Sequence, residues 1–392
     1  MRQVMKIQTL NKISSIGLNR FPHEEYEIAS EFTNPDALLL RSFNMHDMEI
    51  PENVKAIARA GAGVNNIPIE KCTEKGIVVF NTPGANANAV KELVITGMLL
   101  AARRIPEAQR WTETLKGKGD EVPKLVEKGK SDFAGFELSG KKLGVIGLGA
   151  IGVMVANTAV SLGMKVAGYD PFISVDNAWG LANDVAKSIS IDHLLADCNF
   201  ISVHVPLTDS TRGMFNTEKF KIMPKGTVLL NFARGGLVNN KDLKTAIENG
   251  TIGRYVTDFP EEELLEMQNV ICIPHLGAST EEAEDNCAIM AVDQLRDFLE
   301  AGNIKNSVNF PDCELPPSSR HRLVIANRNI PNMVGQITTK LASKSINIAD
   351  MINKHKNELA YNIIDIDQAI TEDQIDAIKK IDGILTARFI SK

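Results

Sequence analysis

The chain has 392 residues and a formal net charge of −6 at pH 7. Its length predicts two or three domains with sizeable hydrophobic cores, and its modest acidity gives no reason to expect a nucleic acid or an anionic membrane as a partner. Five scattered cysteines without close pairs argue against a disulfide framework and a metal site, and favour a reducing compartment. The chain starts without an apolar signal core, and no apolar run reaches the ~18 residues of a membrane span. We therefore expect a cytoplasmic protein.

The first segment alternates short apolar runs with helical patterns, which predicts a small α/β unit. Its strands are expected at residues 6–10, 37–40, 56–60 and 77–81. Arg41 and Arg59 each come at the end of one of these strands, and Gly61 and Ala62 continue from Arg59 into a glycine turn. Ligands of open α/β sheets bind at the carboxyl ends of strands, where an arginine suits a carboxylate or a phosphate. The alternative is a pair of surface arginines without a ligand.

Three glycines, Gly147, Gly149 and Gly152, form a G-x-G-x-x-G motif. The surrounding pattern predicts a strand, a helix and a second strand, at residues 142–146, 150–162 and 165–170. The second strand ends at Asp170, at the spacing of a dinucleotide site. Gly147 would permit a tight turn, Gly149 would let the backbone approach a pyrophosphate, and Gly152 would let helix and strand pack closely.

Asp170 decides which dinucleotide is expected. Its carboxylate would accept the hydroxyls of the adenosine ribose and repel a 2′-phosphate, so NAD is favoured over NADP. The alternative is a plain βαβ unit whose glycines serve only packing.

The rest of the sequence predicts further strands and helices of the same sheet, then a linker and a separate C-terminal unit. Further strands are predicted at 200–205, 226–233, 252–259 and 270–274, with helices at 87–104, 191–198, 240–249 and 280–301. Prolines and serines between residues 302 and 319 predict a linker. After it, strands at 322–326, 346–351, 359–365 and 384–390 and helices at 331–343 and 372–378 give a βαββαβ order, which is ferredoxin-like.

Chemistry is expected where strands end beside the glycine loop. Arg234 follows one strand, and His275 follows another. Oxidation of an alcohol by hydride transfer needs a base for the hydroxyl proton, and histidine is suited to that role. His204 also ends a strand, so the residues alone leave two candidates for the base. Glu263 could assist a histidine, but it lies in the acidic run 261–263, which is equally consistent with a solvated face.

With these residues in place, the chain resembles the D-isomer-specific 2-hydroxyacid dehydrogenases along nearly its whole length. The matching motifs lie at 59–66, 81–83, 147–152, 169–170, 204–206, 231–236 and 274–280, together with Asp258 and Glu263. The resemblance implies a Rossmann-type NAD domain (96–282) inserted in a discontinuous flavodoxin-like substrate domain (1–95 and 283–305). A linker (306–319) and a C-terminal ferredoxin-like domain of the ACT type (320–392) would follow, with the active site between the first two domains.

The same resemblance assigns roles to individual residues. It makes Arg234, Glu263 and His275 catalytic, and leaves His204 in a strand that flanks the cofactor. The NAD site would be lined by Gly147, Gly149, Ala150, Ile151, Gly152, Asp170, Val205, Phe232, Ala233, Arg234, Asp258, His275, Gly277 and Ala278. Arg41 and Arg59, with Gly61 and Ala62, match a subsite for a substrate phosphate. The implied reaction is NAD-dependent oxidation of 3-phospho-D-glycerate to 3-phosphooxypyruvate at the start of serine synthesis.

Two alternatives remain beside this expectation. One is a related dehydrogenase, such as a glyoxylate or hydroxypyruvate reductase. The other is a non-enzymatic NAD-sensing protein of the corepressor kind, against which the presence of Arg234, Glu263 and His275 together argues. Family members associate, so a homodimer or homotetramer is expected.

The C-terminal domain would bind an amino-acid effector through Asn327, Asn329 and Asn347. Three departures bear on the resemblance. Asn327 stands where serine-inhibited relatives tend to have histidine, Asn332 replaces a glycine, and Asn65 stands where the family usually has aspartate. Since asparagine tolerates the left-handed conformation, the loop at Asn332 can still form.

Overall fold

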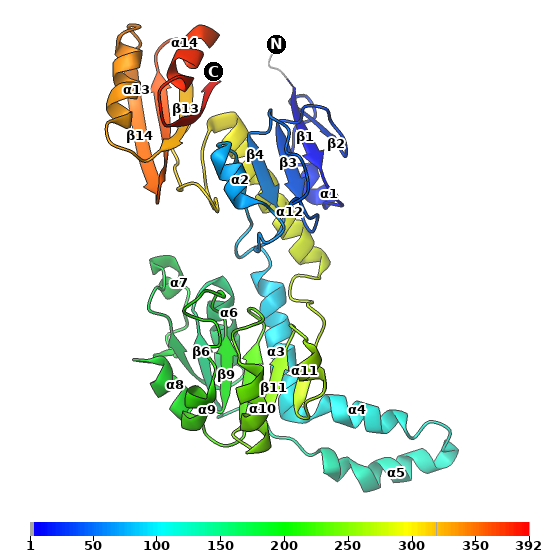
Figure 1. Cartoon of the computed structure of the whole chain (residues 1–392). Coiled ribbons are helices and arrows are strands. Elements are labelled where there is room, and N and C mark those ends of the chain that lie inside the picture. The colour runs from blue at the N-terminus through cyan, green and yellow to red at the C-terminus, as the bar shows by residue number, and fades with distance from the viewer. Residues whose placement is uncertain (1–3, 319, 392) are drawn as a thin grey trace. The chain divides into compact units, whose positions relative to one another are not determined.

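The computed structural model describes residues 4–318 and 320–391. The chain divides into two compact units (Figure 1). The first unit comprises residues 1–86 and 281–392, and the second unit comprises residues 87–280. The chain therefore leaves the first unit once and returns to it, as an inserted domain requires.

The first unit is built on a parallel sheet of five short strands. Their order is β2-β1-β3-β4-β5, the flavodoxin-like order. The strands are β1 (Met5–Thr9), β2 (Tyr26–Ala29), β3 (Ala37–Leu40), β4 (Ala56–Arg59) and β5 (Val78–Phe80), accompanied by the short helices α1 (Ser15–Leu18) and α2 (Ile69–Glu74). All residues of β3 are buried, as a continuous apolar run in a parallel sheet predicts.

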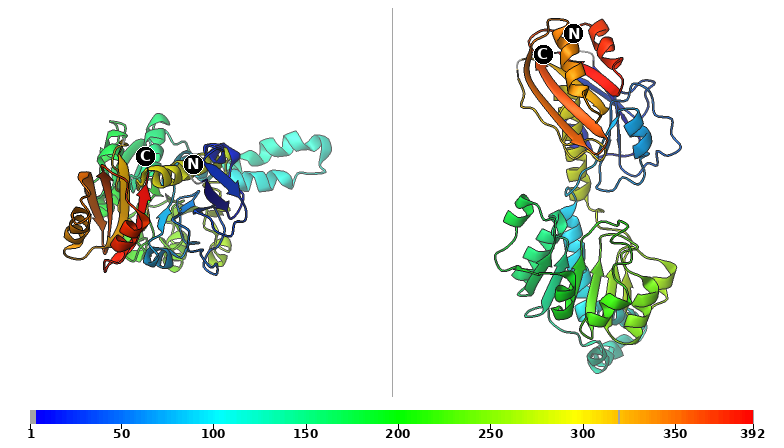
Figure 2. Two further views of the ribbon diagram at one scale, coloured as in Figure 1. Left: turned by 90° about the horizontal axis from the view of Figure 1, so that it is seen from above. Right: turned by 60° about the vertical axis from the view of Figure 1, so that its left-hand side comes forward.

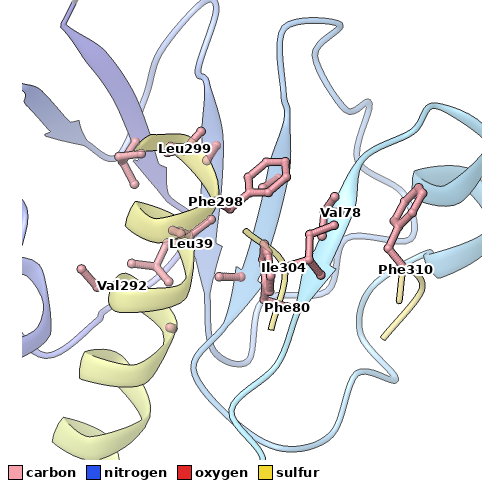
Figure 3. Packing of buried hydrophobic residues seen from close by; sticks show 14 of the residues in the cluster. Leu39, Val78, Phe80, Val292, Phe298, Leu299, Ile304 and Phe310 are labelled. Carbon is pink, nitrogen blue, oxygen red and sulfur yellow. The ribbon is translucent and has the colours of Figure 1, made fainter. Parts of the chain in front are cut away.

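The long helix α12 (Glu281–Ala301) packs on this sheet and supplies much of the core. Figure 3 shows Val292, Phe298 and Leu299 of α12 facing Leu39 and Phe80 of the sheet. Phe80 and Phe298 meet edge to face with ring centroids 5.7 Å apart. Burying each such side chain contributes roughly 1.5–3 kcal/mol, so α12 is an integral part of this unit.

The C-terminal part of the first unit is a four-stranded antiparallel sheet of order β14-β15-β13-β16. Its elements are β13 (His321–Arg328), α13 (Met333–Ala342), β14 (Ile348–Lys356), β15 (Leu359–Ile366), α14 (Glu372–Lys379) and β16 (Ile384–Ile390), so the order is βαββαβ as predicted. One face packs against the two helices through residues such as Ile325 and Ile337. The other face contributes Val324, Tyr361 and Ile363 to the core of the first unit.

The segment predicted as a linker is part of the packed core. Phe310 and Cys313 are fully or almost fully buried, and Leu315 is nearly so. Cys313 forms an antiparallel bridge with Ile304. The sequence pattern was misleading here because its prolines and serines alternate with apolar residues that find partners only in the folded chain.

The buried Arg322 and the partly exposed Arg388 hold the C-terminal sheet to the end of α12. Arg322 of β13 bonds Asp365 through Nε at 2.7 Å, and it also donates to the carbonyl oxygens of Ala301, Leu315 and Pro316. Arg388 of β16 donates to the carbonyl oxygens of Phe298 and Leu299. Both cations therefore satisfy carbonyls at a helix C-terminus, where the helix dipole favours positive charge.

The second unit is a seven-stranded parallel sheet of order β12-β11-β10-β9-β6-β7-β8, the Rossmann order with one further strand. Its strands are β6 (Lys142–Ile146), β7 (Lys165–Tyr169), β8 (Ala186–Lys187), β9 (Phe200–Val203), β10 (Thr227–Asn231), β11 (Ile252–Thr257) and β12 (Val270–Cys272). Helices α3 (Ala87–Arg103) and α6 (Ala150–Ser161) cover one face. Helices α8 (Ile191–Asp197), α9 (Thr217–Ile222) and α10 (Asn240–Glu248) cover the other.

Residues 105–140 contain two helices that extend away from this sheet (Figure 2). These are α4 (Ile105–Glu113) and α5 (Val122–Gly129), and neither has a buried residue. Trp111 of α4 stacks on Phe133 with ring centroids 5.3 Å apart. Within the described part of the chain, no helix has the length and apolar content needed to cross a membrane.

Candidate functional site

The glycine loop between β6 and α6 has the geometry that each glycine was expected to provide. Gly147 has φ of 89°, and a Cβ there would overlap the carbonyl oxygen of His204. A Cβ on Gly152 would overlap the carbonyl oxygen of Gly147. Around Gly149, by contrast, a Cβ would meet no described atom within 4 Å. The loop is thus closed by Gly147 and Gly152 and open above Gly149, where a pyrophosphate fits.

Asp170 is held beside this loop by backbone donors. Its Oδ2 accepts the N–H of Leu148 and its Oδ1 accepts the N–H of Phe172, both at 2.8 Å. These bonds orient the carboxylate and leave further lone pairs for ribose hydroxyls. The first turn of α6, from Ala150 and Ile151 onward, directs its N–H groups to the same loop.

Asp258, His275 and Arg234 come together after the carboxyl ends of β11, β12 and β10, on the same edge of the sheet as the glycine loop. Asp258 is only 1% exposed, and burial raises the pKa of its carboxyl, while the charges of His275 and Arg234 and the N–H of Gly277 act in the opposite direction. Its Oδ1 is buried without a partner among the described residues. An unpaired buried acceptor is costly, so this oxygen is available to accept a hydrogen bond from a bound group.

Arg234 is presented by a turn that Asn231 shapes. The buried Asn231 accepts the N–H of Ala233 and donates to the carbonyl oxygen of Arg234 at 2.9 Å. The guanidinium itself is exposed and donates to the carbonyl oxygen of Ala233. Asn231 is therefore a positioning residue that sequence reasoning recorded only as part of a motif.

His275 is exposed, and its ring lies against Phe259 with centroids 4.8 Å apart. Glu263 belongs to α11 (Glu262–Leu265) and lines a hollow with Lys241 and Lys244 of α10. Glu261 lies beside the turn that follows Arg234. It accepts the side-chain N–H of Asn240, and its Oε1 lies 3.7 Å from the ideal Cβ position of Gly235.

His204, the other candidate base, has a different environment. Its Nε2 contacts Ser202 Oγ at 2.8 Å, and its Nδ1 is buried without a partner among the described residues. Burial lowers the pKa of this imidazole to about 4. A ring that stays neutral under ordinary conditions and is enclosed beside the glycine loop is poorly suited to exchange protons with a substrate.

Not every residue predicted to line the cofactor site points into it. Phe232 is 5% exposed and packs against Gly97 of α3, so its side chain belongs to the core. Val205 packs at the edge of the opposite core cluster, and Ala233 and Ala278 are partly exposed. For Phe232, the strand pattern already implied a buried position, which leaves only its backbone for a ligand.

The two predicted anion-binding arginines lie together in the first unit. Arg59 Nε donates to the carbonyl oxygen of Arg41 at 2.8 Å, and its Nη1 donates to that of Gly63, across the turn that contains Gly61 and Ala62. Asn81 Nδ2 donates to the carbonyl oxygen of Ala62, which further fixes this turn. Arg41 Nη1 forms an ion pair with Glu284 Oε1 at 2.6 Å, a contact that the sequence did not predict.

Comparison with known proteins identifies the family. Residues 95–277 match the model for the NAD binding domain of D-isomer specific 2-hydroxyacid dehydrogenases. A D-3-phosphoglycerate dehydrogenase of Haemophilus influenzae is 31% identical over 341 residues, which are 84% of this chain and 79% of that one. The chain belongs to the D-isomer specific 2-hydroxyacid dehydrogenase family.

Other members of this family are similar over most of the chain. A D-3-phosphoglycerate dehydrogenase of Methanocaldococcus jannaschii is 36% identical over 350 residues, 87% of this chain and 63% of that one. This chain spans only 54% and 51% of the relatives from Archaeoglobus fulgidus and a Synechocystis strain. The structure is also similar to the crystal structure of an NAD⁺-bound 3-phosphoglycerate dehydrogenase of Entamoeba histolytica, with a TM-score of 0.61 and 28% sequence identity. The match covers 78% of this chain and 99% of that one.

The three predicted effector residues all have internal partners. Asn327 is buried, accepts the side-chain N–H of Asn362 and donates to the carbonyl oxygen of Arg328. Asn329 donates to the carbonyl oxygen of Asn357 at 3.3 Å, and Asn347 donates to Asp367. The loop nevertheless forms as expected, since Asn332 adopts φ of 66° at the start of α13.

Among residues 4–318 and 320–391, no group of three or more histidine, cysteine or acidic side chains is placed to bind a metal. The five cysteines are all free thiols. The candidate chemistry therefore depends on the glycine loop, on the Asp258, His275 and Arg234 group, and on the arginines of the first unit.

Proposed function

We propose that this protein is an NAD-dependent D-3-phosphoglycerate dehydrogenase, which oxidises 3-phospho-D-glycerate to 3-phosphooxypyruvate. The observation that carries the proposal is the grouping of Asp258, His275 and Arg234 in the unit with the dinucleotide loop, together with Arg41 and Arg59 in the other unit. The relatives that bear this name support the choice of substrate.

NAD bound at the glycine loop would supply the hydride acceptor. Asp258 would hold the carboxamide of the cofactor through its unpartnered Oδ1. His275 would take the proton of the substrate hydroxyl as the hydride leaves the same carbon. Arg234 would bind the substrate carboxylate and stabilise negative charge on the forming carbonyl oxygen.

The phosphate of the substrate would bind Arg41, with Arg59 and the turn at Gly61 and Ala62 holding the loop that presents it. A substrate with one anionic group needs only Arg234. The presence of two further arginines at strand ends therefore favours a hydroxy acid that carries a second anion.

An acidic side chain next to His275 would stabilise its protonated form during the reaction. The family resemblance selects Glu263 for this role. Glu261 is a second candidate, because its Oε1 lies 3.7 Å from the ideal Cβ position of Gly235 in the turn that follows Arg234. We assign the role to the run 261–263 and expect the pH dependence of activity to identify the residue.

The test is NADH formation with 3-phospho-D-glycerate, beside a panel of glycerate, lactate, glyoxylate and hydroxypyruvate, with NAD and NADP. His275→Ala should lower kcat by about 10²- to 10⁴-fold with little change in NAD affinity, because a general base is lost and the binding site is kept. Glu261→Gln, Glu262→Gln and Glu263→Gln form a matched series. A carboxylate beside His275 would raise the apparent pKa of the proton-transfer step in the pH–rate profile. The variant in which this apparent pKa falls marks the partner of His275. Full activity in His275→Ala would overturn the assignment.

Three accompanying features belong to the proposal. Helices α4 and α5 project without buried residues of their own, which favours association of two copies through this arm; sedimentation of the purified chain measures it.

The C-terminal sheet has the order of an ACT domain, and we propose that it binds an amino-acid effector, for which calorimetric titration with L-serine is the check. The free cysteines favour a cytoplasmic location.

A further inference from the structure

The ion pair between Arg41 and Glu284 changes what the anion subsite can bind. The two side chains are 35% and 44% exposed, so the pair lies at the surface of the first unit and within reach of a ligand. Arg41 Nη1 and Glu284 Oε1 are 2.6 Å apart, so one side of the Arg41 guanidinium already binds a carboxylate of the same chain. A substrate phosphate must therefore share or replace that carboxylate.

The backbone on both sides holds the pair in place. The N–H of Arg41 donates to Asn11 Oδ1 at 2.9 Å, and its carbonyl oxygen accepts from Arg59 and Asn66. Glu284 lies in the first turn of α12, a helix anchored along its length in the core of the first unit. The charged partner of Arg41 is thus delivered by a rigid helix.

The charges around the pair define one small electrostatic site. Cys287, one turn after Glu284 on α12, is buried at 4% exposure. Burial raises the pKa of its thiol, and Glu284 acts in the same direction, while Arg41 and Arg59 act against it. Two positive charges and one negative charge therefore converge there, which leaves a net charge of about +1 for a ligand.

We propose that Glu284 is a built-in competitor for the phosphate subsite and a specificity-determining residue of the dehydrogenase. This inference rests on the proposed function. A phosphate monoester carries about −1.5 to −2 charges at pH 7, so it can replace one carboxylate on Arg41 and still gain attraction. Inorganic anions, which lack the hydroxy acid that binds Arg234, gain too little to displace Glu284. The subsite therefore accepts a phosphate mainly when the rest of the substrate is recognised.

The experiment compares Glu284→Gln with wild type in KM for 3-phospho-D-glycerate and in the inhibition constant of inorganic phosphate. Removing the competitor should lower both by about three- to fivefold, the range that an exposed ion pair supports. KM for D-glycerate, which lacks the phosphate, should change less than about twofold, and kcat should be nearly unchanged. Glu282→Gln is the matched control, because it removes the same charge from an exposed position on the same helical turn.

Glu284→Asp gives a second check, since it keeps the charge and should stay close to wild type. An unchanged or higher KM in Glu284→Gln, or an equal effect of Glu282→Gln, would overturn the proposal. A thermal-unfolding assay with inorganic phosphate measures binding at the subsite in the absence of the reaction. Phosphate should raise the melting temperature of the first unit more in Glu284→Gln than in wild type. If wild type does not oxidise 3-phospho-D-glycerate, the proposed function fails, while this binding difference still decides the role of Glu284.

Discussion

His204 shows how the environment of one side chain sets a pH dependence. Its pKa of about 4 in the folded chain lies below the roughly 6.5 of an unfolded histidine. Between these values the unfolded state binds more protons, so the free energy of unfolding falls as the pH drops from about 6.5 toward 4. We predict that His204→Gln removes about 2 kcal/mol of this fall, measured by urea unfolding at a series of pH values.

The control for this prediction is His23→Gln, at an exposed histidine of the first unit. This substitution removes an imidazole that folding does not bury, so the acid limb of the unfolding profile should remain. An acid limb that is equally steep in wild type and His204→Gln would show that His204 is not the group responsible.

At the same scale, the identities of the site residues were predictable but their geometry was only partly so. Parallel strands deliver their carboxyl ends to one edge of a sheet, which is why Arg234, Asp258 and His275 could be placed together from strand positions alone. The choice among Glu261, Glu262 and Glu263 could not be made, because the chain passes within two residues from Glu261, beside the turn after Arg234, to Glu263, which lines the hollow beside α10.

At the scale of the element, the loop between β6 and α6 gives a pair of contrasting substitutions. Gly149→Ala adds a Cβ to open space, so the fold should be kept and NAD binding lost by at least about tenfold, since the methyl group occupies the path of the pyrophosphate. Gly152→Ala forces a Cβ onto the carbonyl oxygen of Gly147, so it should destabilise the second unit by about 1–3 kcal/mol. Fluorescence titration with NADH and thermal unfolding measure the two effects.

These substitutions separate the two roles of glycine within one loop. The expected pattern is a stable Gly149→Ala that binds NADH poorly and a Gly152→Ala that melts early. Unimpaired NADH binding in Gly149→Ala would show that the open space above the loop is not the pyrophosphate path.

The elements themselves were predictable where burial is complete. Strands such as β3, β6 and β10 are continuous apolar runs because helices cover both faces of a parallel sheet. Helices α4 and α5 were missed because they are short and have no fully buried residue. The sequence did carry two local signals for them. On α5, Val122, Leu125 and Val126 lie on one side and are less exposed than the residues between them. Each helix also has a proline in its first turn, Pro106 and Pro123, which marks a helix start.

For the molecule as a whole, the least predictable feature is that the C-terminal sheet and the first sheet share a core. The prolines of residues 302–319 indicate a boundary, yet Phe310 and Cys313 are buried between elements far apart in sequence. Such burial depends on tertiary partners that no local pattern encodes. The C-terminal sheet should therefore unfold together with the rest of the first unit.

The pair of Arg322 and Asp365 tests this coupling. Both side chains are almost fully buried, and Arg322 also satisfies the carbonyl oxygens of Ala301, Leu315 and Pro316. Arg322→Leu leaves a buried carboxylate and these carbonyls without their cation, so it should lower the free energy of unfolding by about 3–5 kcal/mol. Calorimetry measures the loss, and limited proteolysis should cut first within residues 302–319.

The exposed pair of Arg320 and Asp367 provides the matched control, since it joins the residue just before β13 to the residue just after β15, at 47% and 44% exposure. Arg320→Leu should cost less than about 1 kcal/mol. In the double variant Arg322→Leu with Asp365→Leu, the buried charge is gone as well, so its loss should be smaller than the sum of the two single losses. If instead Arg322→Leu and Arg320→Leu were equally mild, the C-terminal sheet would be attached by its apolar contacts alone.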